Sequence, residues 1–454
     1  MDSRLPPGWP RSERSFPGGV SGGRLLGQRH GFVEVSEHAT GQSVAIIGAG
    51  IIGTALASRL SCRGYRVTLF DAGAPGERGP SRGNAGHIAG SDIFPISGPN
   101  IALAALKMLM RRNGPLKIDP SHIPKLLPWL SAFVRTGKGQ AFDTATRSIS
   151  LLCDGAVDAT EKLFAEAGLG HLFQRVPALY VYDSVQSMDA SRNGWARKAA
   201  AGHPYRFVTA DEVKALEPEL APGFAGGVLS LDWGQVTEPH DVVLGFFEAA
   251  LARGAIFHSL QVETIEANDR GILLTAGGKA HSFDRAVIAA GVWSRTLAAQ
   301  LGDTLPVEAE GGYNTTFPEP AIGVTHPIVF SDRGIVSTSL RTGLRIGGWA
   351  EYAGIAAKAE PAYFDRIETI SRSLFPRLNI SNGVHWAGRR PSMPDSVPVI
   401  SRTTRHPQIF YATGHGHYGL SWAARTTEIL LQLMEGSNQA AKPFSIGRFT
   451  NKTA

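Results

Sequence analysis

One short segment, Gly48-Ala-Gly-Ile-Ile-Gly53, constrains the fold of this chain more than any other. The apolar residues 43–47 before it predict a buried strand, and residues 54–63 after it predict a helix. A glycine-rich loop in the order strand, loop, helix is typical of a Rossmann-type dinucleotide site. The order of these elements carries more information than the glycines alone, since isolated glycine matches are common.

Each glycine of this loop has a separate physical task. Gly48 allows the tight turn, Gly50 lets the backbone approach a pyrophosphate, and Gly53 lets the helix pack closely on the strand. The free N–H groups at the helix start, with the positive end of its dipole, favour an anion there. We therefore expect five residues to bind the cofactor: Gly48, Gly50, Ile51, Ile52 and Gly53.

A second predicted strand, Tyr65 to Phe70, follows the helix and ends at Asp71. This is the spacing at which an acidic residue binds a ribose hydroxyl, so Asp71 indicates a ribose diol rather than a 2′-phosphate. FAD and NAD share this fingerprint. The first seventy residues therefore leave the choice between them open.

Two later segments repeat the pattern of an apolar strand that runs into glycine. Residues 283–290 lead into Gly291, and a predicted strand over 408–413 leads into the loop Gly414 to Gly419. A predicted helix over 420–433 follows that loop. Its start offers a second set of free N–H groups to an extended cofactor.

Several motifs taken together, in this order along the chain, resemble the FAD-dependent D-amino-acid dehydrogenases, which belong to the wider D-amino-acid oxidase, glycine oxidase and sarcosine oxidase superfamily. The resemblance covers about Val44 to Gly436. It rests on five segments: Gly48 to Asp71, Asn84-Ala-Gly-His-Ile88, Leu344-Arg-Ile-Gly-Gly-Trp-Ala-Glu351, Trp386-Ala-Gly-Arg-Arg-Pro-Ser-Met-Pro-Asp395 and Thr413-Gly-His-Gly416.

The resemblance implies an α/β protein with a discontinuous Rossmann-type FAD domain and an α+β substrate domain on a mixed sheet. By this analogy the FAD domain comprises residues 43–95, 240–302 and 380–440, and the substrate domain residues 96–239 and 303–379. The helical segment Thr144 to Gly168 fits either domain. Residues 1–42 are rich in Gly, Arg, Ser and Pro without hydrophobic periodicity, which predicts a disordered extension, interpreted as an overextended start.

The same resemblance implies that FAD also contacts Asn84, Ala85, Gly86, Gly291, Gly414, His415, Gly416 and Gly419. Some relatives attach FAD covalently through cysteine or histidine. Neither Cys62 nor Cys153 matches such a position, so we expect noncovalent FAD.

Oxidation of an amine beside a carboxylate requires a cationic anchor, and the planar fork of arginine suits both carboxylate oxygens. The family's Gly-x-Arg-Pro pattern corresponds to Gly388-Arg-Arg-Pro391 here, which implies that Arg390 is the anchor. Arg389 departs from the family, which usually has an apolar or aromatic residue there. It would bind phosphate, pair with an acid or adjust substrate selectivity.

Three further side chains are candidates near the flavin and substrate. Tyr313 would hydrogen-bond the carboxylate or close the pocket, or else simply pack in the core. His87 and His415 would either take up the ammonium proton or serve as structural hydrogen-bonding groups. His415 and His417 also raise the question of a metal, but no third ligand lies near them in the sequence, so no metal is expected.

The leading interpretation is oxidative deamination of a D-amino acid, including a D-proline or hydroxy-D-proline type, by hydride transfer to FAD. The electrons would pass to a quinone or another acceptor. One alternative is a glycine or sarcosine type of amine oxidase that uses oxygen. Another is a flavoprotein subunit of a hetero-oligomeric dehydrogenase. The sequence leaves the substrate and the oligomeric state open.

Composition restricts the remaining possibilities. The net charge of +6 comes from scattered basic residues, without an aromatic-basic motif, so nucleic acid is not an expected partner. Two cysteines exclude a disulfide scaffold and favour a reducing compartment. Residues 101–112 would form either an interfacial helix or an amphipathic helix on the substrate domain. We expect a cytoplasmic protein, with peripheral contact to the inner membrane face as an open alternative.

Overall fold

Strand β1 (Ser43–Ile47) lies inside a six-stranded sheet, as its apolar sequence predicts for a strand covered on both faces. The strands are parallel, except that edge strand β20 is antiparallel to β21. Their order is β10 (Ile256–His258), β2 (Arg66–Phe70), β1, β14 (Arg285–Ile288), β21 (Ile409–Thr413) and β20 (Val399–Arg402). The predicted α/β, Rossmann-type fold is confirmed.

The two faces of this sheet bury alternate residues of β1. Val44 and Ile46 pack in a cluster with apolar residues of five helices, whereas Ala45 and Ile47 face a second cluster. The first layer contains α1 (Ile51–Cys62), α4 (Gly139–Cys153), α5 (Ala156–Glu166), α8 (Pro239–Leu251) and α11 (Gly419–Met434). The second contains α9 (Ser294–Gln300) and an antiparallel sheet of β11 (Val262–Asn268), β12 (Gly271–Ala276) and β13 (Lys279–Phe283).

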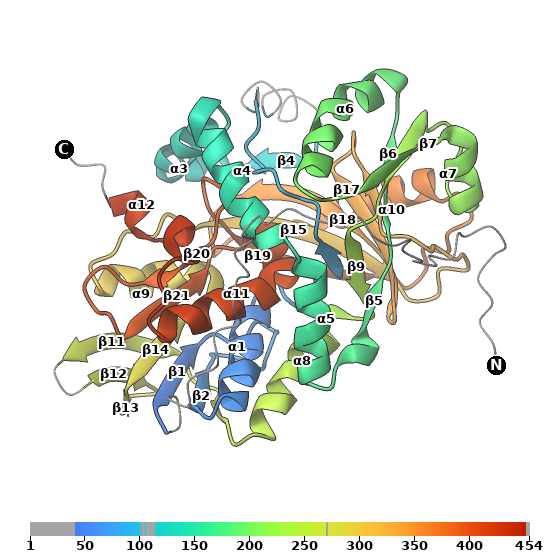
Figure 1. The fold of residues 1–454 in the computed structure, drawn as a ribbon. Helices are drawn as coiled ribbons and strands as arrows, with labels where there is room; N and C mark the ends of the chain where they lie inside the picture. The colour runs from blue at the N-terminus through green and yellow to red at the C-terminus, as the bar shows by residue number, and fades with distance from the viewer. Residues whose placement is uncertain (1–40, 100, 102–104, 106–113, 269–270, 451–454) are drawn as a thin grey trace, which may run out of the picture. The chain divides into compact units, whose positions relative to one another are not determined.

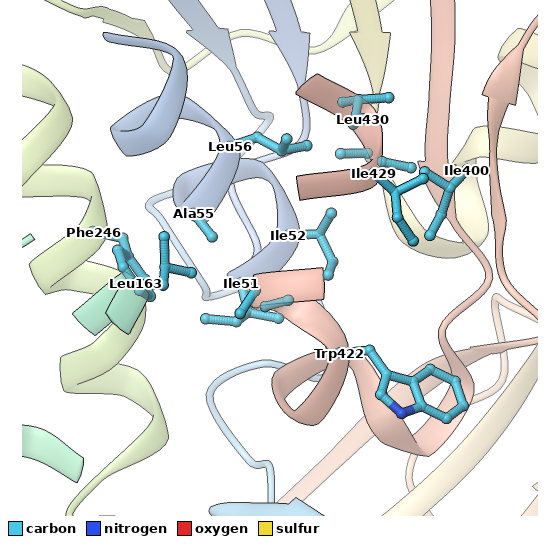
Figure 2. Packing of buried hydrophobic residues seen from close by; sticks show 14 of the residues in the cluster. Ile51, Ile52, Ala55, Leu56, Leu163, Phe246, Ile400, Trp422, Ile429 and Leu430 are labelled. Carbon is cyan, nitrogen blue, oxygen red and sulfur yellow. The ribbon is translucent and has the colours of Figure 1, made fainter. Parts of the chain in front are cut away.

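Helix α1 is buried on nearly all sides, which fixes its N-terminus firmly. Figure 2 shows Ile51 and Ala55 on the side toward Leu163 of α5 and Phe246 of α8. One residue further along each turn, Ile52 and Leu56 point toward α11. The helix begins at Ile51, three residues before the predicted start, because Gly50 already occupies the N-cap position.

The segment predicted as one helical stretch, Thr144 to Gly168, contains parts of two helices. Helix α4 ends at Cys153 and α5 begins at Ala156. Gly155 lies between them with φ +63°, a left-handed conformation that interrupts the helix. Both helices contribute to the cluster against the six-stranded sheet.

A nine-stranded mixed sheet forms the second large layer (Figure 1). It is antiparallel except where β16 pairs with β6 and β18 pairs with β4. Its order is β19 (Val384–Ser392), β15 (Glu308–Phe317), β18 (Gly343–Tyr352), β17 (Ile335–Leu340), β16 (Ile328–Phe330), β6 (Ala178–Tyr182), β8 (Gly226–Ser230) and β7 (Tyr205–Thr209), with β4 (Leu116–Ile118) beside β18. The mixed sheet implied by the resemblance is thus present.

The remaining elements cover this sheet and connect the two large sheets. Helix α10 (Pro361–Leu374) packs its buried Tyr363 and Ile367 in one core with Tyr313 of β15. Three short strands form a separate sheet, β3 (His87–Ala89), β9 (Trp233–Val236) and β5 (Phe173–Arg175). The other helices are α3 (Ile123–Thr136), α6 (Val185–Ala200), α7 (Ala210–Leu216) and α12 (Gly447–Thr450).

All strands of the six-stranded sheet fall within the ranges 43–95, 240–302 and 380–440. Strand β19 also falls in the last range, but it pairs with β15 of the mixed sheet. We therefore propose that the flavin domain resumes at Val399, after β19.

The computed structural model describes residues 41–99, 101, 105, 114–268 and 271–450. The predicted disordered extension, apart from residues 41 and 42, and most of the predicted interfacial helix over 101–112 lie outside these ranges. Within them, no helix combines the length and apolarity that crossing a bilayer would need.

Candidate active site

A first cavity, of about 220 Å³, lies at the carboxyl ends of β1, β2, β14 and β21. Ligands of doubly wound sheets bind at this edge. Eight glycines are among its lining residues. Ten of the residues expected to contact the cofactor line it: Gly48, Gly50, Ile51, Ile52, Asp71, Gly291, Gly414, His415, Gly416 and Gly419.

The glycines of the first loop are required by close approaches. Gly48 has φ +110°, and a Cβ there would stand 2.5 Å from the carbonyl oxygen of Ala289. Gly53 lines neither large cavity, because its α-carbon lies against the carbonyl of Gly48, where a Cβ would collide. Gly53 thus lies where helix packs on strand, the task assigned to it from the sequence.

The start of α1 is uncapped and faces this cavity. Gly50 is the N-cap residue and makes no side-chain hydrogen bond to the first turn. The Ile51 N–H donates to Ser81 Oγ (3.0 Å), whereas the N–H groups of Ile52 and Gly53 belong to the positions that a helix leaves without intrahelical acceptors. This end of α1 therefore suits a diphosphate.

Asp71 stands at the end of β2 with its carboxylate held by the backbone. Oδ2 accepts from Ala49 N–H (2.8 Å) and Oδ1 from Gly73 N–H (3.1 Å). A carboxylate has about four acceptor positions, so two such bonds orient it while leaving capacity toward the cavity. A ribose hydroxyl is a suitable donor for that capacity.

A second cavity, of about 610 Å³, adjoins the first. Five residues line both cavities: Ile51, Pro80, Ser81, Gly416 and Gly419. Asn314 lines the second cavity with a buried Oδ1 that has no protein partner among the described residues. Its Nδ2 donates to the Gly83 carbonyl (2.8 Å), which fixes the amide orientation and leaves Oδ1 as an acceptor for a ligand.

These features fit FAD. The backbone at the start of α1 would hold its diphosphate, Asp71 its ribose, and the second cavity would receive its ring beside Asn314. FAD supplies the oxidant, since its ring accepts a hydride.

The Asn84 to Gly86 turn borders the second cavity. Asn84 and Ala85 line it, whereas Gly86 does not; Asn84 Oδ1 accepts from Gly86 N–H (2.8 Å) and so closes the turn. The Asn84 carbonyl accepts from Nη1 of Arg345 (2.6 Å), which is buried and pairs with Glu238 (3.2 Å). Burial lowers the pKa of Arg345, and the Glu238 charge opposes that effect. Arg345 thus ties the turn to β18.

Arg390 projects from β19 over Gly312 of the neighbouring strand β15, where any side chain would collide with its guanidinium. Its Nη1 donates to Glu310 Oε1 (3.0 Å) and to the Trp349 carbonyl (3.0 Å). Nη2 and Nε have no hydrogen-bond partner among the described residues, and Arg390 lines the second cavity. The two N–H groups on this free edge form a fork that matches the two oxygens of a carboxylate.

Glu310 accepts hydrogen bonds from four side chains, one of which is Arg390. Oε1 accepts from Arg390 and from His417 Nε2 (2.6 Å), and Oε2 accepts from Ser392 Oγ (2.7 Å) and Tyr352 OH (3.3 Å). Burial alone would raise the pKa of Glu310, but His417, Arg390 and Ser392 together lower it well below the usual range. Glu310 is therefore an ionised, fully bonded carboxylate.

Arg389 and Tyr313 belong to a network on the other face of this sheet. Arg389 Nη1 donates to Glu351 Oε2 (2.9 Å), and the Tyr313 hydroxyl donates to the same oxygen (2.7 Å). The Tyr313 ring packs on Tyr363 and Phe364 of α10. The structure thus gives Arg389 an acidic partner. Tyr313 lines the second cavity, but its hydroxyl lies beside Arg389 rather than Arg390. Tyr352 is the tyrosine in the Arg390 network.

His415 is buried and His87 is partly buried, and both imidazoles are neutral. Burial lowers the pKa of His87 to about 4 and that of His415 to about 3. Nε2 of His87 is hydrogen-bonded to Thr338 Oγ1 (2.5 Å), and Nε2 of His415 to Thr426 Oγ1 (2.9 Å). His87 lines the second cavity and His415 the first. Their protonation would be costly, which favours the structural role.

Sequence reasoning missed Glu310, Asn314, Arg345 and Tyr352, and it considered His417 only as a metal ligand. One signal for these residues was available in the sequence. Glu310, Gly312 and Asn314 are every second residue of β15, so they lie on one face of the strand. The pairing of that face with Arg390 depends on strand register between distant segments. The described residues contain no cluster of three or more histidine, cysteine or acidic groups suited to a metal.

Aromatic and aliphatic side chains form the rest of the second cavity. Trp386 lies against Gly83, and Trp349 donates its indole N–H to the Gly114 carbonyl (3.1 Å). The wall beyond Arg390 includes Leu116, Ile118, Trp129, Leu130, Phe133 and Tyr352.

Both cysteines lie outside the lining of these two cavities. Cys62 is exposed at the end of α1, and Cys153 is buried at the end of α4, where burial raises its pKa to about 12. A protonated, inaccessible thiol is a poor nucleophile. Their positions favour noncovalent cofactor binding.

Comparison with known proteins places the whole folded chain in one family. Residues 43–433 match the family model described as "DAO: FAD dependent oxidoreductase". A D-amino-acid oxidase from Bradyrhizobium diazoefficiens is 34% identical over 420 residues, which cover 90% of this chain and 99% of that protein.

Solved structures with the same fold are more distant in sequence. Glycine oxidase from Geobacillus kaustophilus aligns with a TM-score of 0.66 and 21% identity, over 89% of this chain and 98% of that one. The L-proline dehydrogenase of P. horikoshii aligns with a TM-score of 0.67 and 18% identity, over 91% and 98% of the two chains. The family match and its extent establish that this chain belongs to the DAO family of FAD-dependent oxidoreductases.

Proposed function

We propose that this enzyme oxidises an α-amino acid at its CH–NH bond, with Arg390 as the carboxylate anchor and FAD as the hydride acceptor. The observation that carries the proposal is the free Nη2 and Nε edge of Arg390, in a cavity that adjoins the glycine-lined one. A carboxylate held by that fork fixes which face of the α-carbon meets the flavin.

We further propose a D-amino acid as substrate. The support is the D-amino-acid oxidase that shares 34% identity over nearly its whole length, together with the motifs that resemble D-amino-acid dehydrogenases. The apolar wall of the second cavity suits a neutral side chain, and D-proline or hydroxy-D-proline is one candidate among these. The product would be a 2-oxo acid with ammonia, or a cyclic imine from a cyclic substrate.

The electron acceptor is proposed to be a quinone or another carrier rather than oxygen. The support is the resemblance to the dehydrogenases. An oxygen-using amine oxidase of the glycine or sarcosine type is the alternative, and the relative at 34% identity is itself named an oxidase. A hetero-oligomeric subunit is less well supported, since this chain itself forms both adjoining cavities.

Anaerobic bleaching of the bound flavin tests the proposal. The purified holoenzyme is mixed with paired D- and L-amino acids, glycine, sarcosine and D-proline, and flavin absorbance is followed. We expect D-amino acids to bleach the flavin faster than their L-enantiomers. Bleaching only by glycine or sarcosine, or only by L-enantiomers, would contradict the assignment.

The acceptor is tested with the best substrate of that panel. Turnover is measured with oxygen, with a soluble quinone and with an artificial dye. A faster turnover on the quinone, with little peroxide released, is the expected result. Stoichiometric peroxide without faster quinone turnover would instead identify an oxidase.

A further inference from the structure

We propose that His417, oriented by Glu310, is the base that takes the ammonium proton of the substrate. This inference rests on the proposed function. It assigns a catalytic role to a histidine that the sequence pattern offered only as a metal ligand, and a positioning role to Glu310.

The hydrogen bond between His417 and Glu310 fixes the tautomer of the imidazole. Glu310 has four partners and remains ionised, so its Oε1 only accepts hydrogen bonds. His417 Nε2, 2.6 Å away, must therefore carry the hydrogen. The lone pair of a neutral imidazole is then on Nδ1, which has no hydrogen-bond partner among the residues that the structure describes.

His417 is close to the place where the amine would lie. His417 and Arg390 bond to the same oxygen of Glu310, so they are neighbours, and both line the second cavity. In an α-amino acid the nitrogen is attached to the carbon that bears the carboxylate. A carboxylate on the free edge of Arg390 thus places the ammonium group in the same cavity that His417 lines.

The other imidazoles beside the two cavities are less suitable. His415 is deeply buried and His87 partly buried, and each is bonded through Nε2 to a threonine hydroxyl without an acidic hydrogen-bond partner. His417 is different, because its side chain is 38% exposed and its Nε2 is hydrogen-bonded to the buried carboxylate of Glu310.

The charged groups around the Glu310–His417 pair come from several elements. Charged or titratable groups around the Glu310–His417 pair are Arg390 from β19, Tyr352 from β18, Tyr418 beside His417, and Asp92 and Glu308 slightly farther away. Burial raises the pKa of both tyrosines, so they stay neutral. With an amino acid bound, the carboxylate and Glu310 are balanced by Arg390 and the ammonium group, so transfer of the proton to His417 moves one positive charge next to Glu310 without changing the net charge.

The step itself is a simple proton transfer. An N–H bond of the substrate ammonium breaks, and a new N–H bond forms at His417 Nδ1 to give an imidazolium paired with Glu310. The lone pair left on nitrogen stabilises the carbon when its hydride departs to FAD, the oxidant named by the family.

Reduction kinetics give the first test. In anaerobic mixing, we expect His417→Gln to slow flavin reduction about 100-fold at neutral pH, as for loss of a general base. The loss should shrink as pH rises and free amine becomes abundant, and added imidazole should restore part of the rate. His171→Gln, a change at an exposed histidine, should behave as wild type.

The second test does not depend on turnover. Benzoate, a carboxylate without an ammonium proton, should bind the holoenzyme with uptake of nearly one proton near neutral pH, measured by calorimetry in buffers of different ionisation enthalpy. His417→Gln should abolish that uptake while flavin content stays normal. Glu310→Gln should reduce the uptake and weaken benzoate binding, because Arg390 loses its orienting partner.

Two outcomes would overturn the inference. One is a His417→Gln enzyme with the wild-type rate and pH profile of flavin reduction. The other is a loss of rate equal at every pH, without imidazole rescue, combined with undiminished proton uptake. If instead the wild-type flavin is bleached by no amino acid, the proposed function fails, and the benzoate experiment still tests His417.

Discussion

The two adjoining cavities offer a ligand different kinds of contact. Beside α1 the contacts come mainly from main-chain groups brought close by glycine, as at Gly48 and Gly50. Beside β15 they come from side-chain charges that are already paired, as in Arg390 with Glu310. The first cavity should therefore be sensitive to added volume and the second to removed charge. The predictions below test that difference.

The largest effect is expected from added volume in the first cavity. Gly50→Val places a branched side chain at the N-cap of α1, beside Ser81 Oγ, where the diphosphate would lie. FAD affinity should fall on the order of a thousandfold, about 4 kcal/mol. Flavin absorbance of the purified, folded protein measures it.

The matched control for Gly50 is Gly323→Val. Gly323 is exposed, and no atom lies within 4 Å of the position of its missing Cβ. This variant should keep its full flavin content. A yellow, fully loaded Gly50→Val protein would contradict the backbone cavity as the diphosphate site.

Removal of charge in the second cavity is expected to have the next largest effect. Arg390→Ala should lower kcat/KM about 100-fold, roughly 3 kcal/mol, mainly through KM, because the substrate loses its anchor. Bound FAD should be retained. Steady-state kinetics and the flavin spectrum provide the two readouts.

Arg389 provides the comparison on the opposite face of the same strand. Arg389→Met should leave KM within about twofold of wild type, since its partner is Glu351, although it should lower the melting temperature. If Arg389→Met raised KM as much as Arg390→Ala, the assignment of the two faces would be wrong.

A smaller effect concerns acid stability. The pKa of His87 falls to about 4 in the folded chain, below its ordinary 6.5, so the unfolded chain binds the proton more readily. The stability from neutral His87 is complete above about pH 6.5 and is lost as pH falls toward 4, by about 2 kcal/mol near pH 5. His87→Gln should show a shallower loss of melting temperature, whereas His171→Gln should follow wild type.

The smallest effect is expected at the cysteines. Because neither thiol lines the cavities, acid precipitation should release all the flavin into the supernatant, and Cys62→Ala should keep the wild-type flavin content. Flavin that stays with the precipitated chain would show a covalent link.

Sequence patterns predicted the first cavity better than the second, for a physical reason. The loop from Gly48 to Gly53 and Asp71, the expected ribose ligand, lie within one βαβ unit, where local spacing determines geometry. The Arg390 network depends on the pairing of β15 with β19 and on His417, which lies in the turn after β21 of the six-stranded sheet. The family motif indicated Arg390, but no local pattern showed that Glu310 and His417 share one carboxylate oxygen.

Three smaller differences between the sequence predictions and the structure also have identifiable causes. The start of α1 was misplaced because Gly50 has no capping side chain to mark the boundary. The break between α4 and α5 comes from the left-handed Gly155, although many glycines within helical patterns are tolerated. Tyr313 was a candidate because its segment resembles a tyrosine-bearing segment of the family. It lines the second cavity, but its hydroxyl bonds Glu351 rather than lying beside the anchor.

The bridge between Ser392 and His415 bears on how enzymes of this design diversify. It fastens the end of the anchor-bearing strand to the loop that leads into α11, so the anchor keeps its place relative to the cofactor sheet. New substrate preferences would then arise by changes in the apolar wall of the second cavity, while the position of the reacting carbon relative to the flavin stays the same. Engineered chimaeras should accordingly keep residues 384–419 from one parent and exchange α3 and β4.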